Sequence, residues 1–218
     1  MGKILFLTCP EWDNGTQYLS RYSTLIIQQA KKLNIEYKAF YKDEAIPEKT
    51  TKYLIKKQPS LIFINGHGDE KSLEGDKDKI LFSVDKNLNL LKNKITYARA
   101  CNAGNLLGKK IAEKGKTCFI GYKSPFSFWI DNKRCSTPLK DKIASLFLLP
   151  SNEIIISLLK GKTAKQANEI SKKMMVKNML KIVKMNEKKE PGAMAWLSLL
   201  WNNYSGQVLL GEDNLKFN

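Results

Sequence analysis

Short apolar runs alternate with amphipathic stretches through the first two-thirds of the chain, and this alternation constrains the fold more than any other feature. Runs typical of β-strands occur at residues 3–9, 36–41, 60–65, 95–100 and 117–122. Apolar side chains at helical spacing occur between them, at residues 17–32, 47–56 and 106–114. Strands that are apolar on both faces and separated by helices form parallel sheets with helices on both sides. The sequence therefore predicts an α/β fold of three layers around a mostly parallel sheet.

The final third of the chain has a different pattern. Residues 124–138 form an irregular aromatic segment, and helices are predicted at residues 139–149, 153–159, 163–185 and 192–204, the last of them packed on the sheet. We expect a final strand and turn within residues 208–217, and a hairpin or flap within residues 74–84. No linker composition separates these segments, so we expect one domain across residues 1–218.

The charge of the chain is strongly positive. The formal net charge is +16, from 37 basic and 21 acidic side chains. The basic excess is spread along the chain and is almost all lysine, because arginine occurs only at positions 21, 99 and 134. Nucleic-acid readers rely on clustered basic side chains and on the arginine fork. We therefore expect a solvated lysine-rich surface and no nucleic-acid partner.

Several function classes are excluded by what the sequence lacks. No apolar run approaches the ~18 residues that cross a bilayer, and the run after Lys3 is too short for a signal peptide. We therefore expect a cytoplasmic protein with no membrane partner. Four cysteines without CxxC spacing and a single histidine argue against a zinc site and for reduced thiols. No dinucleotide or Walker motif is present, so we expect neither a metal nor a cofactor.

Two chemically active side chains follow consecutive strands of the predicted sheet. His67 lies just after the run at 60–65, and Cys101 just after the run at 95–100. Carboxyl ends of parallel strands line one edge of a sheet, so both side chains are expected to face one crevice. His67 is then a base for a cysteine nucleophile, and the helix that begins near Asn105 is expected to lower the pKa of Cys101. The N–H groups of Gly68 and Cys101 are candidates for an oxyanion hole.

The two motifs together resemble a known family. Residues 61–68 (LIFINGHG) and 97–104 (YARACNAG) are similar to the His-Gly and Ala-Cys segments of the caspase-like (clan CD) cysteine peptidases. The short His–Cys spacing, and residues 208–215 (VLLGEDNL), most resemble the gingipain and clostripain-like group. The sequence departs from the caspase pattern at Arg99, where caspases have glutamine, and at Ala103, which precedes the glycine.

The resemblance implies a single caspase-like peptidase domain that hydrolyses amides through a thioester. His67 is then the acid and base, Cys101 is the nucleophile, and Gly68 and Cys101 supply the oxyanion donors. The family requires no third catalytic residue, and the sequence offers no clear candidate for one. The alternative is a catalytically inactive, flavodoxin-like or caspase-like binding or scaffold domain. The oligomeric state is not indicated.

The residue that precedes the scissile bond in a protein or peptide substrate is expected to meet Arg99, which borders the specificity pocket in relatives. A buried guanidinium needs a partner, and Glu11, Asp13 and Asp131 are the candidates. An acid at the pocket floor predicts a preference for Lys or Arg, which we favour; an unpaired Arg99 predicts Asp or Glu, and a balanced pair predicts Asn. Trp129 or Phe126 is expected beside Cys101 in the substrate cleft.

Overall fold

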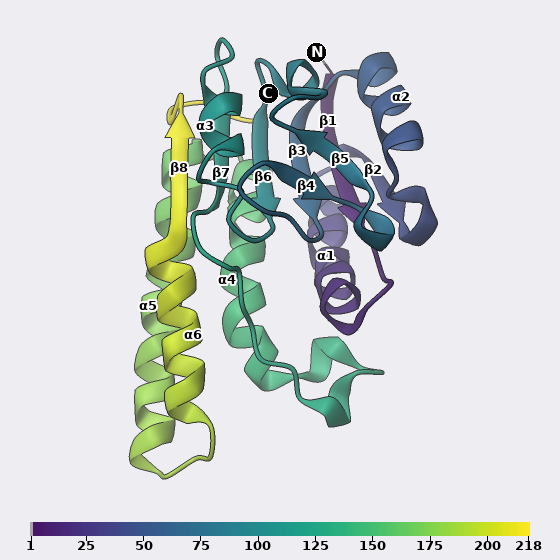
Figure 1. The fold of residues 1–218 in the computed structure, drawn as a ribbon. Coiled ribbons are helices and arrows are strands. Elements are labelled where there is room, and N and C mark those ends of the chain that lie inside the picture. The colour runs from purple at the N-terminus through teal and green to yellow at the C-terminus, as the bar shows by residue number, and fades with distance from the viewer. Residues whose placement is uncertain (1) are drawn as a thin grey trace.

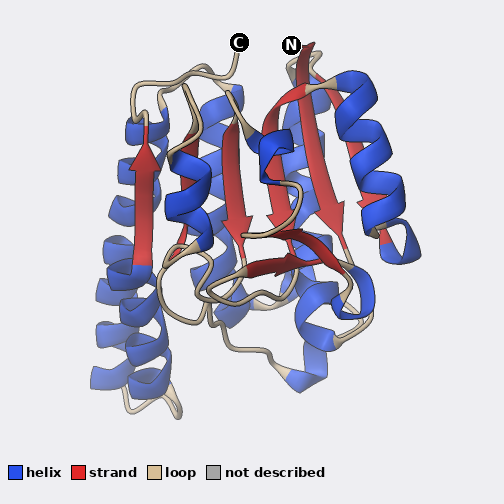
Figure 2. Ribbon diagram, turned by 45° about the horizontal axis from the view of Figure 1, so that its top comes forward, coloured by secondary structure: helices blue, strands red, loops and turns tan. Residues whose placement is uncertain are grey.

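The computed structural model describes residues 2–218, and its centre is a six-stranded sheet of order β2-β1-β3-β6-β7-β8. The strands are β1 (Gly2–Cys9), β2 (Glu36–Tyr41), β3 (Pro59–Asn65), β6 (Ile95–Arg99), β7 (Cys118–Tyr122) and β8 (Gln207–Gly211). All neighbours pair in parallel except β8, which runs antiparallel to β7 at one edge. Figure 2 shows the arrow of β8 opposed to those of the central strands. The predicted mostly parallel sheet is confirmed.

Two groups of helices cover the two faces of this sheet (Figure 1). One group is α1 (Asn14–Lys32), α4 (Lys142–Leu159), α5 (Ala164–Glu187) and α6 (Ala193–Gly206); the other is α2 (Pro47–Lys57) and α3 (Leu107–Ala112), with the hairpin β4 (Ser72–Glu74) and β5 (Ile80–Ser83). Single 3-10 turns are η1 (Lys42–Glu44), η2 (Asp76–Asp78), η3 (Leu88–Leu91), η4 (Asn132–Arg134) and η5 (Pro138–Lys140). Side chains alternate along a strand, so Leu5 and Leu7 join the core under α1 and α4, whereas Phe6 joins the core on the opposite face.

Two predictions about the final third of the chain are wrong. The two helices expected at 139–149 and 153–159 are one helix, α4, which continues through Pro150; that residue is buried together with Leu148, Ser151 and Asn152. Helix α6 pairs with α5 in a hairpin that extends past the sheet (Figure 1). The final strand expected within residues 208–217 is confirmed as β8; beyond it Lys216 makes one bridge to Thr163, and Phe217 is buried.

Helix α4 passes the length and hydropathy test for a membrane span, with 18 residues and a mean hydropathy of 1.5. In the structure 61% of this stretch is buried inside the protein. Core helices of this kind pass the same test. The apolar character of α4 is therefore explained by the sheet and the helices that it contacts.

Candidate active site

The carboxyl ends of the central parallel strands border a small cavity of about 90 Å³. It is lined by Gly15, Thr16, Leu19, Gly66, His67, Arg99, Ala100, Cys101, Phe126 and Phe128. The structure thus places His67 and Cys101 on the same cavity, because β3 and β6 are paired neighbours in the sheet. Helix α1 supplies one wall, and the segment after β7 supplies another.

His67 is held by a carboxylate from the loop after β1. The Nε2 atom of His67 lies 2.7 Å from Oδ2 of Asp13, and the indole ring of Trp12 lies 5.5 Å from the imidazole ring. Asp13 is also the N-cap of α1, where its carboxylate accepts from the Thr16 N–H at 2.7 Å. Burial alone would raise the pKa of Asp13, but its hydrogen bonds with His67 and Thr16 outweigh burial and lower this pKa. With Nε2 occupied, Nδ1 is the ring nitrogen left for proton transfer.

The sequence predicts Asp13 in the specificity pocket and offers no clear third residue for the site. The structure instead places Asp13 on His67. Helix α1 begins at Asn14, earlier than residue 17 where its apolar pattern starts. The signal that could have been used is the capping box formed by Asp13 and Thr16. It shows that the carboxylate of Asp13 has a fixed position at the sheet edge.

Cys101 is half-buried and follows the end of β6. Its thiol donates a long hydrogen bond of 3.9 Å to the carbonyl oxygen of Phe126. Burial raises the pKa of Cys101. The expectation that a helix N-terminus lowers this pKa is wrong, because α3 begins only at Leu107, has six residues, and does not outweigh the loss of solvation. The resting form of Cys101 is therefore the protonated thiol.

Gly68 does not line the cavity but packs against Ala100, the residue before Cys101, at a point where the backbone is tightly enclosed. A Cβ atom at this position would lie 2.8 Å from the carbonyl oxygen of Ser72 and 3.1 Å from the Cβ of Ala100. Gly68 and Leu73 form an antiparallel β-bridge. Two backbone hydrogen bonds flank it: the Glu74 N–H donates to the His67 carbonyl at 3.0 Å, and the Asp69 N–H donates to the Ser72 carbonyl at 3.1 Å. Neither of these two hydrogen bonds uses the Gly68 N–H, which is left for another acceptor.

A tight turn follows the candidate nucleophile. Asn102 has a φ of 57°, in the left-handed region that asparagine tolerates better than most residues. Its N–H donates to the Ser124 carbonyl at 3.2 Å. Within residues 2–218, the backbone bonds include none from the Cys101 N–H. The turn thus leaves the N–H of Cys101, like that of Gly68, available as an oxyanion donor.

Arg99 is fully buried, and its guanidinium does not face solvent. All of its N–H groups bond to neutral acceptors: Nε to Asn65 Oδ1 at 2.9 Å, Nη1 to Asn152 Oδ1 at 2.9 Å and Ser151 Oγ at 3.4 Å, and Nη2 to the Leu19 carbonyl at 2.9 Å and Ser23 Oγ at 3.3 Å. The ring of Phe63 lies 5.1 Å from the guanidinium. The prediction that Glu11, Asp13 or Asp131 pairs with Arg99 is wrong, because amides, hydroxyls and a carbonyl hold this cation.

The other two acids have partners elsewhere. Glu11 accepts from Ser20 Oγ at 2.7 Å and lies 3.7 Å from Arg21 and 3.9 Å from Lys42. Asp131 caps η4 by accepting from the Lys133 N–H at 2.9 Å. Neither residue lines the cavity. The structure does not bring these carboxylates to Cys101.

The aromatic wall of the cavity is made by Phe126 and Phe128, whose rings are 6.1 Å apart. Trp129, which was expected there, instead packs edge-on against Trp196 at 6.4 Å and does not line the cavity. The sequence analysis named Phe126 as an alternative and missed Phe128. Both occur in the segment after β7, where a run of aromatic residues is the signal.

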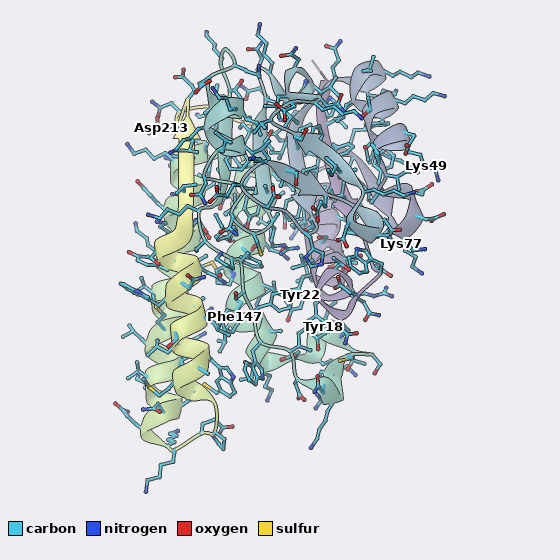
Figure 3. All side chains as sticks on the ribbon, viewed as in Figure 1. Tyr18, Tyr22, Lys49, Lys77, Phe147 and Asp213 are labelled. Atoms are coloured by element: carbon cyan, nitrogen blue, oxygen red, sulfur yellow. The ribbon has the colours of Figure 1, made fainter. Side chains whose placement is uncertain are left out.

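Buried hydrogen bonds hold that wall in place. Asp141 accepts from the Tyr18 hydroxyl at 3.1 Å and from the Asp131 N–H at 2.8 Å, and its carbonyl accepts from the Tyr22 hydroxyl at 3.2 Å. Figure 3 labels both tyrosines, at the level of α1 and α4 below the sheet. The amide of Asn203 makes two further bonds to the backbone of Ser127, at 2.9 and 2.6 Å. These bonds tie the segment that carries Phe126 and Phe128 to α1, α4 and α6.

No group of three or more His, Cys, Asp or Glu side chains that could hold a metal ion occurs in residues 2–218. The described part of the site consists of a thiol, an imidazole, a carboxylate and backbone N–H groups. These groups can carry out nucleophilic attack and proton transfer on a carbonyl compound.

Comparison with known proteins gives a structural likeness only. No protein-family model and no curated protein matches the sequence. Solved structures do match. The Arg-specific cysteine proteinase gingipain R matches with a TM-score of 0.60 and 13% sequence identity. The complex of the pro- and mature domains of Porphyromonas gingivalis RgpB matches with a TM-score of 0.58 and 13% sequence identity. A third, described as a protease, has a TM-score of 0.57 at 12% identity.

These matches cover 98–99% of this chain and 46–48% of theirs, so the chain spans about half the length of those proteins. At this identity the likeness shows the fold. The chain has the mostly parallel caspase-like α/β fold of these cysteine proteinases.

Proposed function

We propose that this chain is a cysteine endopeptidase, with Cys101 as the nucleophile, His67 as the acid and base, and Asp13 as the residue that positions His67. The observation that carries the proposal is the cavity that His67 and Cys101 line together, with the imidazole fixed by the 2.7 Å bond to Asp13. The fold that the chain shares with cysteine proteinases supports the same reaction class.

The raised pKa of Cys101 decides how the first step proceeds. Because the thiol is protonated at rest, His67 Nδ1 takes its proton as sulfur attacks the scissile carbonyl carbon. The carbonyl π electrons move to oxygen, and the N–H groups of Gly68 and Cys101 bind the resulting oxyanion. His67 then gives the proton to the leaving amine, the C–N bond breaks, and a thioester remains on Cys101.

Water completes the cycle. His67 Nδ1 takes a proton from the water as its oxygen attacks the thioester carbonyl. The second oxyanion uses the same two N–H groups. When it collapses, the C–S bond breaks, the acid product leaves, and the proton returns to the Cys101 sulfur. Throughout, Asp13 stabilises the protonated ring of His67 and holds Nε2–H in a single orientation.

A second candidate function is a binding or scaffold domain that does not catalyse hydrolysis. The specific observation in its favour is the state of Cys101, whose thiol is partly buried, has a raised pKa and bonds to the Phe126 carbonyl. A bound peptide would then occupy the cavity without reacting.

Hydrolysis by purified variants separates the two. We expect wild-type protein to cleave an unstructured protein such as casein, and Cys101→Ala to have no activity above background. Cys135→Ala is the matched control, because Cys135 is also a half-exposed free thiol but does not line the cavity. Cleavage by Cys101→Ala would refute the peptidase proposal, and inactivity of the wild type toward every substrate would favour the binding domain.

A further inference from the structure

The cavity beside Cys101 has a composition that bears on the substrate. Most of its lining is apolar or lacks a side chain, with Leu19, Phe126 and Phe128 as the largest apolar groups. Among residues 2–218, no carboxylate lines it. The hydroxyl of Thr16, one of the few polar groups, bonds to the Asp13 backbone at 3.2 Å. A basic side chain that enters the cavity therefore meets no carboxylate, and the cation of Arg99 is part of the lining.

The volume of the cavity favours small side chains. At about 90 Å³ it holds about three groups of the size of a water molecule, which each fill roughly 30 Å³. A methyl or hydroxyl group is of similar size. The side chains of alanine, serine, threonine and valine fit within this space, whereas those of lysine, arginine, glutamate and the aromatic residues are larger and would extend out through its open side. The hydrogen bonds of Asp141 and Asn203 keep the walls in place.

The charges at the cavity disfavour basic side chains. Arg99 is buried, lines the cavity and bonds to neutral groups, so a lysine or arginine side chain would face a cation and no acid. An aspartate or glutamate side chain would be attracted by the charge of Arg99, but it would find the N–H groups already bonded to Asn65, Asn152, Ser151, Ser23 and Leu19. A desolvated carboxylate without donors is strongly disfavoured.

We propose that this cavity binds the residue before the scissile bond and selects small uncharged side chains, above all alanine and serine. The inference rests on the proposed peptidase function and names its substrate class. It replaces the preference for Lys or Arg expected from the sequence. It also separates this chain from gingipain R, which is described as Arg-specific.

A series of fluorogenic peptides tests the proposal, each identical except for Ala, Ser, Val, Leu, Lys, Arg or Asp before the cleaved bond. We expect kcat/KM for Ala and Ser to exceed that for Lys, Arg and Asp by about 100-fold, since misfit in a pocket is worth roughly 10- to 200-fold per group. Equal or faster hydrolysis after Lys, Arg or Asp would overturn the inference and leave the peptidase function standing.

A pocket variant gives a second, independent readout. Leu19→Ala enlarges the cavity and is expected to raise kcat/KM for the Leu peptide relative to the Ala peptide by about tenfold. Ile27→Ala, a buried truncation on the same helix outside the cavity, controls for loss of stability and is expected to leave the ratio unchanged. If the ratio of kcat/KM for the Leu and Ala peptides is unchanged in a folded Leu19→Ala protein, the substrate side chain before the cleaved bond binds at another subsite. That result would overturn the inference.

Peptidyl acyloxymethyl ketones with Ala or Lys at the same position distinguish the two possible failures. Faster labelling of Cys101 by the Ala reagent supports the inference, and faster labelling by the Lys reagent overturns it alone. Absence of Cys101 labelling by both reagents, together with no hydrolysis in the peptide series, would overturn the peptidase function and the inference with it.

Discussion

Replacing Asp13 with asparagine removes the negative charge beside His67 and retains most of the local structure. Asparagine is as good an N-cap as aspartate, so α1 keeps its first turn and the side-chain carbonyl oxygen of the new amide can still accept from the Thr16 N–H. The change therefore isolates the effect of the carboxylate on the imidazole. Asp13→Ala removes the charge and the cap together.

The size of the effect follows from the hydrogen bond in the structure. A bond between a carboxylate and a protonated ring is worth about 1.5–3 kcal/mol, and each 1.36 kcal/mol changes a rate tenfold. The side chains of His67 and Asp13 are 46% and 28% exposed, so solvent screening favours the lower half of this range. We expect kcat/KM of Asp13→Asn to fall by roughly 10- to 100-fold.

The assay is kcat/KM on the Ala peptide, combined with thermal unfolding. Asp13→Asn should unfold within about 1 °C of wild type, whereas Asp13→Ala should lose about 1 kcal/mol, or roughly 2–4 °C. Asp131→Asn is the matched control, since Asp131 is also an N-cap carboxylate but does not contact His67. Wild-type kcat/KM in Asp13→Asn would refute the positioning role, as would an equal loss in Asp131→Asn.

Three other perturbations test separate parts of the account. Gly68→Ala should lower kcat by about 10²–10³-fold in steady-state assays, because its Cβ would lie 2.8 Å from the Ser72 carbonyl and displace the oxyanion donor; full activity would remove Gly68 from the site. Arg99→Met should destabilise the protein by several kcal/mol in urea unfolding, because buried acceptors lose their donors; unchanged stability would show that these acceptors find other partners. Alkylation of Cys101 by iodoacetamide should be slow at pH 7 and accelerate above the usual cysteine pKa of about 8.5, because burial raises the pKa of Cys101. Cys9, whose pKa is raised to about 12, should stay unlabelled. A rate of Cys101 alkylation that reaches its plateau below pH 8 would contradict the raised pKa of Cys101.

The layered sheet could be predicted because its signal is local. Each strand is a continuous apolar run, and the runs recur between amphipathic stretches, so β-α-β order is readable without any tertiary contact. The positions of His67 and Cys101 follow from the same reasoning, since the carboxyl ends of parallel strands share one edge. The break predicted between residues 149 and 153 was wrong, because the burial of Pro150, Ser151 and Asn152 in the core outweighs the tendency of proline to end a helix.

The environment of Arg99 could not be predicted, because its acceptors come from distant segments. Asn65 ends β3, Leu19 and Ser23 belong to α1, and Asn152 belongs to α4. A sequence indicates that a buried cation needs partners, but carboxylates are only one solution. The expected Lys or Arg preference depended on an acid at the pocket floor and on the resemblance to gingipains, and among residues 2–218 no acid lines the cavity. The role of Asp13 was missed for a related reason, since its position became clear only with the start of α1.

Rapid acid quenching during turnover tests the central claim most directly, because it asks whether Cys101 carries the acyl group. After mixing with a peptide ester of alanine, the quenched protein is digested and mapped by mass spectrometry. The account predicts a mass increase equal to the acyl half of the substrate, located on Cys101, and much reduced in His67→Ala. Hydrolysis that proceeds without acylation of Cys101, or an acyl group on Cys135 instead, would contradict it.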